Sequence, residues 1–261
     1  MKIARYRHKG HIRFGVLEDG LLHEIERTPF TGIRRQGRTC RLEEVELLTP
    51  VYPQKIIAVG LNYRDHAEEL RMPIPDEPVL FMKPPSSLLA HGGEIVYPSM
   101  SRRVDYEAEL VLVCGKECRD VSPREASSCI LGYTCGNDVT ARDLQAKDGQ
   151  WTRCKSIDTF CPLGPFIETE VDVQELVVEL RLNGEVRQSS AASNMIFTPQ
   201  ELLSFTSRVM TLYPGDVIMT GTPPGVGEMF PGDVVEVVIE GVGTLRNTVT
   251  AEGRSSEIVE E

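Results

Sequence analysis

Three acidic residues alternate along the run VDYEAELVLV, residues 104 to 113: Asp105, Glu107 and Glu109. Successive side chains of a β-strand point to opposite faces, so a strand over this run places all three carboxylates on one face. Neighbouring acids on that face lie about 7 Å apart and repel by roughly 2 kcal/mol per pair at an effective dielectric near 20. A solvated strand face tolerates this arrangement, and so does a face whose carboxylates share a bound cation.

The remaining residues of the run favour a shared bound cation over a solvated strand face. Val111 and Val113 continue the acidic face, and the opposite face is apolar. A strand that is apolar on both faces is typical of a buried one. Carboxylates without a nearby His or Cys favour Mg²⁺, Mn²⁺ or Ca²⁺ over zinc. Asp138, in GNDVTARDLQ, is a candidate further ligand because it lies where a strand gives way to a helical turn; alternatively Asp138 or Thr140 caps a helix at 141–148.

A histidine and a glutamate in GLNYRDHAEEL, residues 60 to 70, are spaced for an acid–base pair. His66 and Glu69 are three residues apart and share one face of a helical turn. A carboxylate beside an imidazole orients the ring and raises its basicity, which suits a general base. The spacing differs from the HExxH of zinc peptidases, and a solvent-exposed surface helix produces the same pattern without any catalytic role.

Two further segments offer groups to an anionic substrate. Lys155, in WTRCKSIDTFCP, lies just before an expected turn and can place its ammonium against a negative charge. The loop MTGTPPGVG, residues 219 to 227, follows an apolar strand and lacks the GK[ST] of a phosphate-binding loop. We expect a rigid loop that offers Thr222 and backbone N–H groups to a carboxylate.

The elements that position these residues are mostly strands. From residue 55 onward, β-branched runs bounded by Gly and Pro predict at least eight strands, and Asn183-Gly184 predicts a type I′ hairpin. An N-cap, a proline and a capping-box Glu predict helices at 123–131 and 199–210. Shorter helical pieces are expected at 62–70 and 141–148. Many strands with few helices between them predict a mainly β (α+β) fold of mixed or antiparallel sheets with peripheral helices.

The chain divides near residue 52. Residues 1–52 read as short strands broken by turns at Lys9-Gly10 and Asp19-Gly20, and two prolines in LLTPVYPQ mark a junction. We therefore expect a small N-terminal β module over 1–52 and a main domain over 53–261.

The composition of the chain limits the kinds of partner that it can bind. The net charge is −11 and the Lys and Arg residues are scattered, which argues against nucleic acid and anionic membrane, since both require a basic face. A small anionic substrate needs only a few local cations. No apolar run approaches the roughly 20 residues of a membrane span. The seven cysteines are odd in number and show no CxxC spacing; thiols of this kind, without a signal peptide, predict a cytoplasmic protein.

Taken in order, these segments resemble the fumarylacetoacetate hydrolase family. The resemblance runs through GLNYRDHAEEL, EPVLFMKP, DYEAELVLV, GNDVTARDLQ, the lysine of CKSIDTFCPLGP and GDVIMTGTPPGVG, and it covers about residues 55–250. It implies the family's mixed β-sheet roll, with a small N-terminal β module, and a homodimer.

The resemblance also implies a metal site. The family's divalent metal would be bound by Glu107, Glu109 and Asp138, with Mg²⁺ as the expected ion, Mn²⁺ as an alternative and Ca²⁺ as a possible occupant. Asp105 falls outside this ligand set and is expected either to support a neighbouring group or to be solvated.

The remaining roles follow from the same resemblance. His66 and Glu69 correspond to the water-activating or proton-moving pair, on a segment that acts as a lid in the family. Lys155 corresponds to the lysine beside the metal. The residues expected to contact the oxo-acid end of the substrate are Arg142, Gln145 and Thr222.

These parts predict an enzyme that stabilises the enolate of a 2-oxo or β-diketo acid. Hydrolysis of a C–C bond in an acylpyruvate is the favoured reaction, because the His66–Glu69 pair suits an activated water. Isomerisation of a 2-hydroxyhepta-2,4-dienedioate-type diacid, and decarboxylation or tautomerisation of oxaloacetate, use the same enolate and remain alternatives. A non-catalytic, metal-dependent protein that binds oxo acids is a further alternative.

Overall fold

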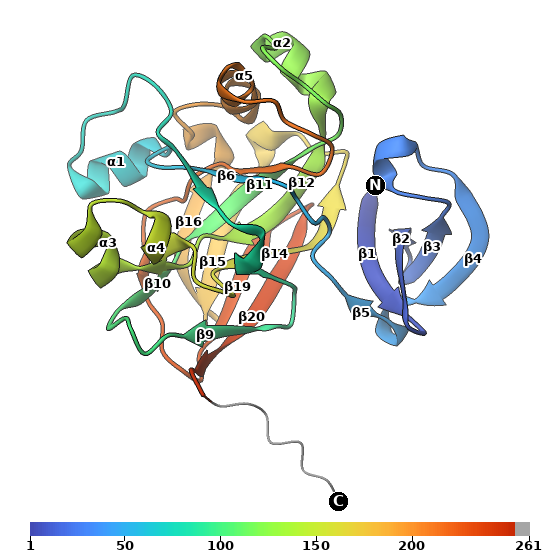
Figure 1. The fold of residues 1–261 in the computed structure, drawn as a ribbon, viewed down its shortest axis with the longest axis horizontal. Helices are drawn as coiled ribbons and strands as arrows, with labels where there is room; N and C mark the ends of the chain where they lie inside the picture. The colour runs from blue at the N-terminus through green and yellow to red at the C-terminus, as the bar shows by residue number, and fades with distance from the viewer. Residues whose placement is uncertain (254–261) are drawn as a thin grey trace, which may run out of the picture.

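Strands dominate the computed structural model, which describes residues 1–253. They form sheets of twelve, three and five strands, with the helices at the periphery (Figure 1). The mainly β fold with peripheral helices expected from the sequence is confirmed. None of the helices within residues 1–253 is long and apolar enough to cross a membrane.

The largest sheet has the order β4-β3-β2-β1-β14-β12-β11-β17-β6-β7, with β5 on β1 and β8 on β14. Its N-terminal strands, blue in Figure 1, are β1 Lys2–His8, β2 His11–Glu18, β3 Leu21–Ile25, β4 Arg35–Arg41 and β5 Glu46–Leu47. The others are β6 Ile56–Val59, β7 Leu80–Lys83, β8 Leu88–Leu89, β11 Ala108–Cys114, β12 Ile130–Asn137, β14 Cys161–Glu168 and β17 Val217–Met219. The N-terminal strands join this sheet through β1, which pairs with β14.

The five-stranded sheet contains β16 Glu185–Ala191, β15 Val177–Leu182, β19 Val234–Ile239, β20 Gly243–Ala251 and β9 Glu94–Tyr97. The three-stranded sheet contains β13 Thr140–Ala141, β10 Val104–Tyr106 and β18 Gly227–Glu228. Asn183 and Gly184, between β15 and β16, have φ angles of 55° and 84°. A type I′ turn requires positive φ at both central residues, so the predicted hairpin is confirmed.

Strand β11 lies in the core, and all seven of its residues are buried. Leu110 and Leu112 pack in the cluster that contains Leu180 of β15. On the opposite face, Val111 packs with Val217 of β17. The expectation that this run is buried on both faces is therefore confirmed.

The helices are short, and two of the five begin at the capping boxes that the sequence predicts. They are α1 Arg64–Leu70, α2 Pro123–Ala126, α3 Arg142–Asp148, α4 Thr152–Lys155 and α5 Pro199–Val209. Single 3₁₀ turns occur at Pro29–Thr31, Leu42–Glu44, Pro85–Ser87, Ser127–Cys129, Val173–Glu175 and Ala192–Asn194. Ser122 and Thr198 form the predicted capping boxes.

Two local expectations about the helices are wrong. The helix expected over 123–131 ends at Ala126 and continues only as a 3₁₀ turn, because Ile130 begins β12, which pairs with β11 and β14. Neither Asp138 nor Thr140 caps α3: its N-cap is Ala141, without a side-chain cap. In both cases contacts with distant segments prevail over the local signal. The neighbouring strands fix where β12 begins, and the Asp138 side chain is used in the contacts described below.

The strand expected over 104–113 is interrupted at Glu107. Strand β10 pairs with β13 and β18, whereas β11 belongs to the large sheet. Side chains accept the backbone hydrogen bonds at the break: the N–H of Glu107 donates to Asn137 Oδ1 and that of Ala108 donates to Gln188 Oε1, both at 2.9 Å. Because the chain changes sheet here, the period-two rule does not carry from Asp105 to the acids that follow.

A buried aspartate anchors the approach to β6, the strand that leads to α1. Asp216 is 1% exposed. Its Oδ1 accepts from the backbone N–H groups of Gln54 (3.1 Å) and Lys55 (2.9 Å), and its Oδ2 accepts from that of Tyr213 (2.9 Å). The Lys55 ammonium lies 2.6 Å from Oδ2. One carboxylate thus joins the junction at residues 54–55 to the start of β17.

We expect Asp216→Ala to lower the free energy of unfolding by about 3 kcal/mol, because it leaves three backbone donors and one ammonium without their acceptor. Urea denaturation measures this loss. The matched control is Asp158→Ala at an exposed position, which should stay within about 0.5 kcal/mol of the parent protein. Equal unfolding midpoints for the two variants would contradict the anchoring role.

Candidate active site

The predicted metal-binding acids converge where β11 begins and β12 ends. The two strands are antiparallel, with Ala108 opposite Asn137, so Glu107 and Glu109 lie beside Asp138. One carboxylate oxygen of each acid lies within 4.8 Å of the others, and all three residues are buried. Distant positions in the chain thus form one compact all-oxygen cluster.

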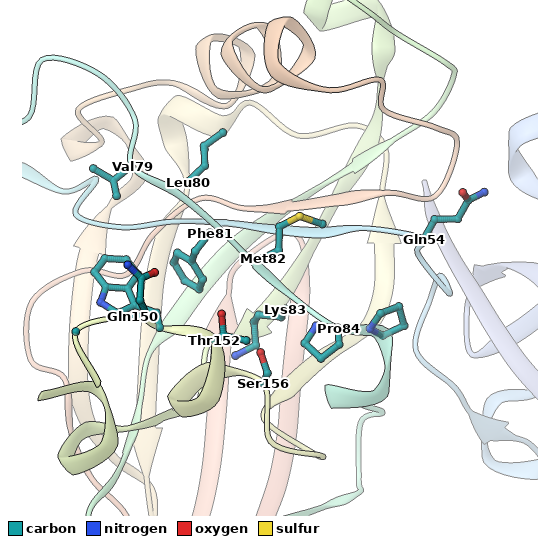
Figure 2. Close-up of a pocket in the computed structure, with 13 residues that line it drawn as sticks. Gln54, Val79, Leu80, Phe81, Met82, Lys83, Pro84, Gln150, Thr152 and Ser156 are labelled. Atoms are coloured by element: carbon teal, nitrogen blue, oxygen red, sulfur yellow. The ribbon is translucent and has the colours of Figure 1, made fainter. Parts of the chain in front are cut away.

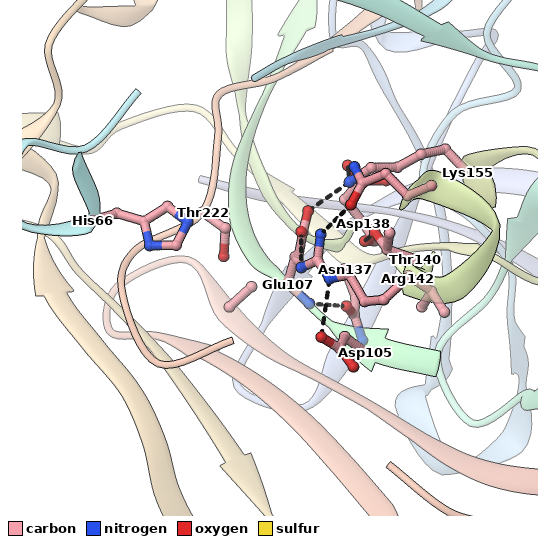
Figure 3. A network of polar contacts seen from close by, with 12 residues as sticks. His66, Asp105, Glu107, Asn137, Asp138, Thr140, Arg142, Lys155 and Thr222 are labelled. Carbon is pink, nitrogen blue, oxygen red and sulfur yellow. Dashed lines mark hydrogen bonds and ion pairs between the residues drawn. The ribbon is translucent and has the colours of Figure 1, made fainter. Parts of the chain in front are cut away.

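Cationic side chains neutralise part of the negative charge of this cluster. Lys155, at the end of α4, donates from Nζ to Glu107 Oε2 (2.7 Å) and Asp138 Oδ2 (2.5 Å), and Arg142 pairs with the other oxygen of Glu107 (Figure 3). Burial alone would raise the pKa of Glu107, but the charges of Lys155 and Arg142 outweigh it and lower that pKa to about 2. Burial would likewise lower the pKa of Lys155, but Asp138 and Glu107 raise it. Both groups are therefore charged.

Glu109 differs from its neighbours. Within residues 1–253 it forms no ion pair, and its Oε2 accepts from the backbone N–H of Gly221 at 2.7 Å. Burial, followed by the negative charges of Asp138 and Glu107, raises the pKa of Glu109 well above its ordinary value. A cation placed beside the three carboxylates would supply the charge that Glu109 lacks.

Asp105 is not solvated, which excludes one of the two roles expected for it. It is fully buried and pairs with Arg103 (3.0 Å) and with Arg142 Nε (2.9 Å). Arg142 also donates to Gln145 Oε1 at 3.0 Å. Asp105 therefore helps to hold the Arg142 guanidinium against Glu107.

Lys83 is a cluster residue that sequence reasoning missed. Its side chain is buried, and Nζ donates to Asp138 Oδ1 and, at 3.4 Å, to the carbonyl of Val139. The available signal was a lone lysine at the end of the apolar run PVLFMK. Such a lysine usually extends to solvent, and only the tertiary structure shows that it faces Asp138.

The two residues of the predicted acid–base pair meet on α1. His66 Nδ1 lies 2.8 Å from Glu69 Oε2, and His66 is 7% exposed. The backbone N–H of Gly225 donates to Glu69 Oε1 at 3.1 Å, which joins α1 to the 219–227 loop. Asp65, in the first turn, accepts from Ser190 and from Asn194 (3.2 Å). Helix α1 is thus attached to two other parts of the fold.

Gln188 is a second residue that sequence reasoning missed, and it orients Thr222. Its Oε1 accepts from the backbone N–H of Ala108, and its Nε2 donates to the carbonyl of Pro223 and to Thr222 Oγ1, both at 2.8 Å. The two backbone partners leave only one orientation for the amide. Thr222 therefore accepts from Gln188 and keeps its own O–H to donate elsewhere. No sequence pattern marks this glutamine in an otherwise ordinary strand.

A cavity of about 450 Å³ joins these groups, a size typical of small-molecule sites. Its wall includes seven of the nine predicted residues: His66, Glu107, Glu109, Arg142, Gln145, Lys155 and Thr222. Glu69 and Asp138 contact the wall residues His66 and Lys155 instead of lining the cavity. In Figure 3, His66 and Thr222 lie to one side of Glu107, and Lys155 and Asp138 lie to the other.

A larger hollow of about 720 Å³ is drawn in Figure 2. It adjoins the smaller cavity, because Val79, Phe81 and Trp151 line both. Lys83 lines this hollow, but none of the three clustered carboxylates does. Size alone would point to this hollow, whereas the convergence of acids, cations and a histidine points to the smaller one. We therefore take the smaller cavity as the candidate active site.

Comparison with known proteins identifies the family. The fumarylacetoacetate (FAA) hydrolase C-terminal model matches residues 55–250, and an Rv2993c-like N-terminal model matches residues 1–50. The chain belongs to the fumarylacetoacetate hydrolase family.

Relatives and solved structures show the range of this family. A 5-carboxymethyl-2-hydroxymuconate delta-isomerase structure from Mycobacterium smegmatis is 43% identical, with a TM-score of 0.92 over 97% of this chain and 100% of that one. The human mitochondrial oxaloacetate tautomerase FAHD2B is 42% identical over 219 residues, 79% of this chain and 70% of that protein. A maleylpyruvate hydrolase from Sphingobium sp. SYK-6, in complex with manganese(II) and pyruvate, is 30% identical, with a TM-score of 0.80 over 96% of this chain and 99% of that one.

We expect Gln188→Leu to raise KM for an oxo-acid substrate by about tenfold, with a smaller change in kcat, because Thr222 loses the donor that orients its hydroxyl. Thr222→Val should have a similar effect. If the two residues act together, the double variant should be little worse than either single one. Steady-state kinetics measure all three variants, with Gln174→Leu at an exposed position as the control. Fully additive losses would contradict the coupling.

Proposed function

We propose that this chain is a divalent-metal-dependent enzyme that acts on a 2-oxo or β-diketo acid, and that its favoured reaction is hydrolysis of a C–C bond in an acylpyruvate-type substrate. The observation that carries the proposal is one cavity whose wall includes His66, paired with Glu69, and two acids of the carboxylate cluster, Glu107 and Glu109. The oxo-acid names of the relatives support the substrate class.

The carboxylate cluster fits a hard divalent cation. It offers only oxygen atoms, its acids are buried close together, and Glu109 has a raised pKa that an added positive charge would lower. We propose Mg²⁺ held by Glu107, Glu109 and Asp138, with Mn²⁺ as the alternative because manganese occupies the maleylpyruvate hydrolase structure. Ca²⁺ could occupy the same ligands. When bound, such an ion supplies Lewis-acid stabilisation of negative charge on the substrate's oxygens.

The cations of the chain bind and orient the substrate. Lys155 uses two of its N–H groups on Glu107 and Asp138, which leaves the third for a substrate oxygen. The free O–H of Thr222 can donate to the substrate carboxylate. Arg142 and Gln145, which contact each other, add donors at the same end of the cavity.

His66 is the group that transfers a proton from water to the substrate. A carboxylate that accepts from Nδ1 keeps the proton of a neutral imidazole on that nitrogen, so Glu69 leaves Nε2 free to act as a base. Nε2 takes a proton from water, and the oxygen of that water bonds to the distal carbonyl carbon. The C–C bond then breaks, and its electron pair passes to the pyruvate part as an enolate. Return of the proton to the enolate carbon completes the reaction.

Isomerisation or tautomerisation of the same substrate class is the second candidate, because one similar structure is a delta-isomerase and one relative is an oxaloacetate tautomerase. Here Nε2 of His66 would carry a proton from one carbon to another without an attacking water. Decarboxylation of oxaloacetate uses the same enolate. A protein that only binds oxo acids is the non-catalytic alternative. Product identification on acylpyruvates, oxaloacetate and unsaturated diacids separates these reactions.

We also propose that the chain works as a homodimer and that residues 1–52 form a module attached to a catalytic domain over 53–261. Separate family models over residues 1–50 and 55–250 support the division, and the homodimer rests on the family resemblance alone.

Removal of divalent metal should abolish turnover, because the clustered carboxylates would then offer negative charge where the substrate's oxygens must bind. The measurement is activity after treatment with a chelator, followed by readdition of Mg²⁺ or Mn²⁺. Unchanged activity in the metal-free protein would contradict the proposed mechanism.

Removal of the proposed base should slow the chemical step and leave the affinity for the metal unchanged. We expect His66→Ala to lower kcat for hydrolysis by about 10²- to 10⁴-fold while the affinity for Mg²⁺, measured by calorimetry, stays within about twofold. His11→Ala, on an exposed strand position, is the matched control. A collapse of metal affinity in His66→Ala would instead make the histidine a ligand.

A further inference from the structure

Apolar side chains line much of the candidate active-site cavity, and we call this part of its wall the apolar compartment. It is formed by Leu61, Leu70, Met72, Val79, Phe81 and Trp151. On the basis of the function proposed above, we propose that this compartment holds an apolar acyl chain of the substrate and discriminates against a second carboxylate there. The substrate class is then an acylpyruvate with a hydrocarbon tail.

Three of these side chains, Phe81, Trp151 and Val79, lie together beside Lys155. The rings of Phe81 and Trp151 meet edge to face, with centroids 5.1 Å apart. A Cβ added to Gly60 would lie 3.3 Å from Trp151 and 3.4 Å from Val79, so the glycine lets these side chains approach the backbone. Lys155 Nζ lies 5.2 Å from the centre of the Phe81 ring. Phe81 therefore adjoins the ammonium that would bind the substrate's oxygens.

The end of α1 and the segment after it supply the outer part of this compartment. Leu70, Met72 and Val79 line the cavity and are each about half exposed, at 47%, 53% and 50%. Large apolar side chains held in water at the mouth of a cavity lose that exposure when a hydrocarbon chain covers them, which favours binding.

The cations of the cavity wall are already paired with other groups of the protein. Among the described residues that line it, the lysine and arginine side chains are Lys155 and Arg142. Lys155 is held between Glu107 and Asp138, and Arg142 is held by Asp105, Glu107 and Gln145. A second carboxylate in the apolar compartment would lose water without gaining a cation, which is unfavourable. A methylene at the same place gains free energy.

The test measures binding separately from turnover. Calorimetry in the presence of Mg²⁺ compares the binding of 2-oxohexanoate, 2-oxooctanoate and 2-oxoadipate. None of the three has the 4-keto group that C–C hydrolysis of an acylpyruvate requires. We expect affinity to rise about fourfold for each added methylene. We expect 2-oxoadipate, which has as many carbons as 2-oxohexanoate, to bind at least about tenfold more weakly. Equal or tighter binding of 2-oxoadipate would overturn the inference.

A variant tests the location of the compartment. Val79→Arg places a cation at its half-exposed wall and should reverse the preference in favour of 2-oxoadipate, whereas Val209→Arg, at an exposed position on α5, should leave it unchanged. An unchanged preference in Val79→Arg would overturn the assignment of this wall. If the protein prefers apolar tails but hydrolyses no acylpyruvate, the proposed reaction is rejected and the apolar compartment stands. If none of the three 2-oxo acids binds, the proposed reaction and the apolar compartment are both rejected.

Discussion

The pairing of buried charges around Glu107 and Asp138 is the interaction on which the candidate site depends. A charge that is removed from water must be paired and hydrogen-bonded, or folding becomes unfavourable. Lys155 reaches both acids and Lys83 reaches Asp138, so α4 and β7 are held against the ends of β11 and β12. The same contacts that permit the burial of these acids also position the groups that would face a substrate.

The interruption at Glu107 gives this cluster its shape. A continuous strand would alternate its side chains in a single sheet, whereas the change of sheet separates the surroundings of Asp105 from those of Glu109. Asn137 and Gln188 accept the backbone hydrogen bonds that the sheets no longer provide. Because Gln188 also reaches Thr222, the repair of the backbone and the orientation of a hydroxyl in the cavity wall involve one side chain. The strand break and the shape of the candidate site thus depend on the same side chain.

Local signals predicted much of the fold. The capping boxes at Ser122 and Thr198 and the turn at Asn183 depend on neighbouring residues alone, and the structure contains all three. The early end of the helix expected over 123–131 and the cap of α3 could not be predicted in this way, because contacts with distant segments override weak local preferences there. Lys83 and Gln188 were missed for a related reason, since a lone lysine or glutamine on a strand is ordinary until its partners are known.

The sequence by itself determined the apolar strand with its acids, the His66–Glu69 spacing and the ordered segments typical of the fumarylacetoacetate hydrolase family, because these depend on residue type and short separations. Only the tertiary structure decided that Asp105 supports Arg142, that Lys83 lies against Asp138, and that Gln188 orients Thr222. Such pairings join residues far apart in the chain, and no local pattern encodes them. The cavity wall, which combines charged and apolar side chains, exists only after α1, β7 and the segment at Trp151 have packed together.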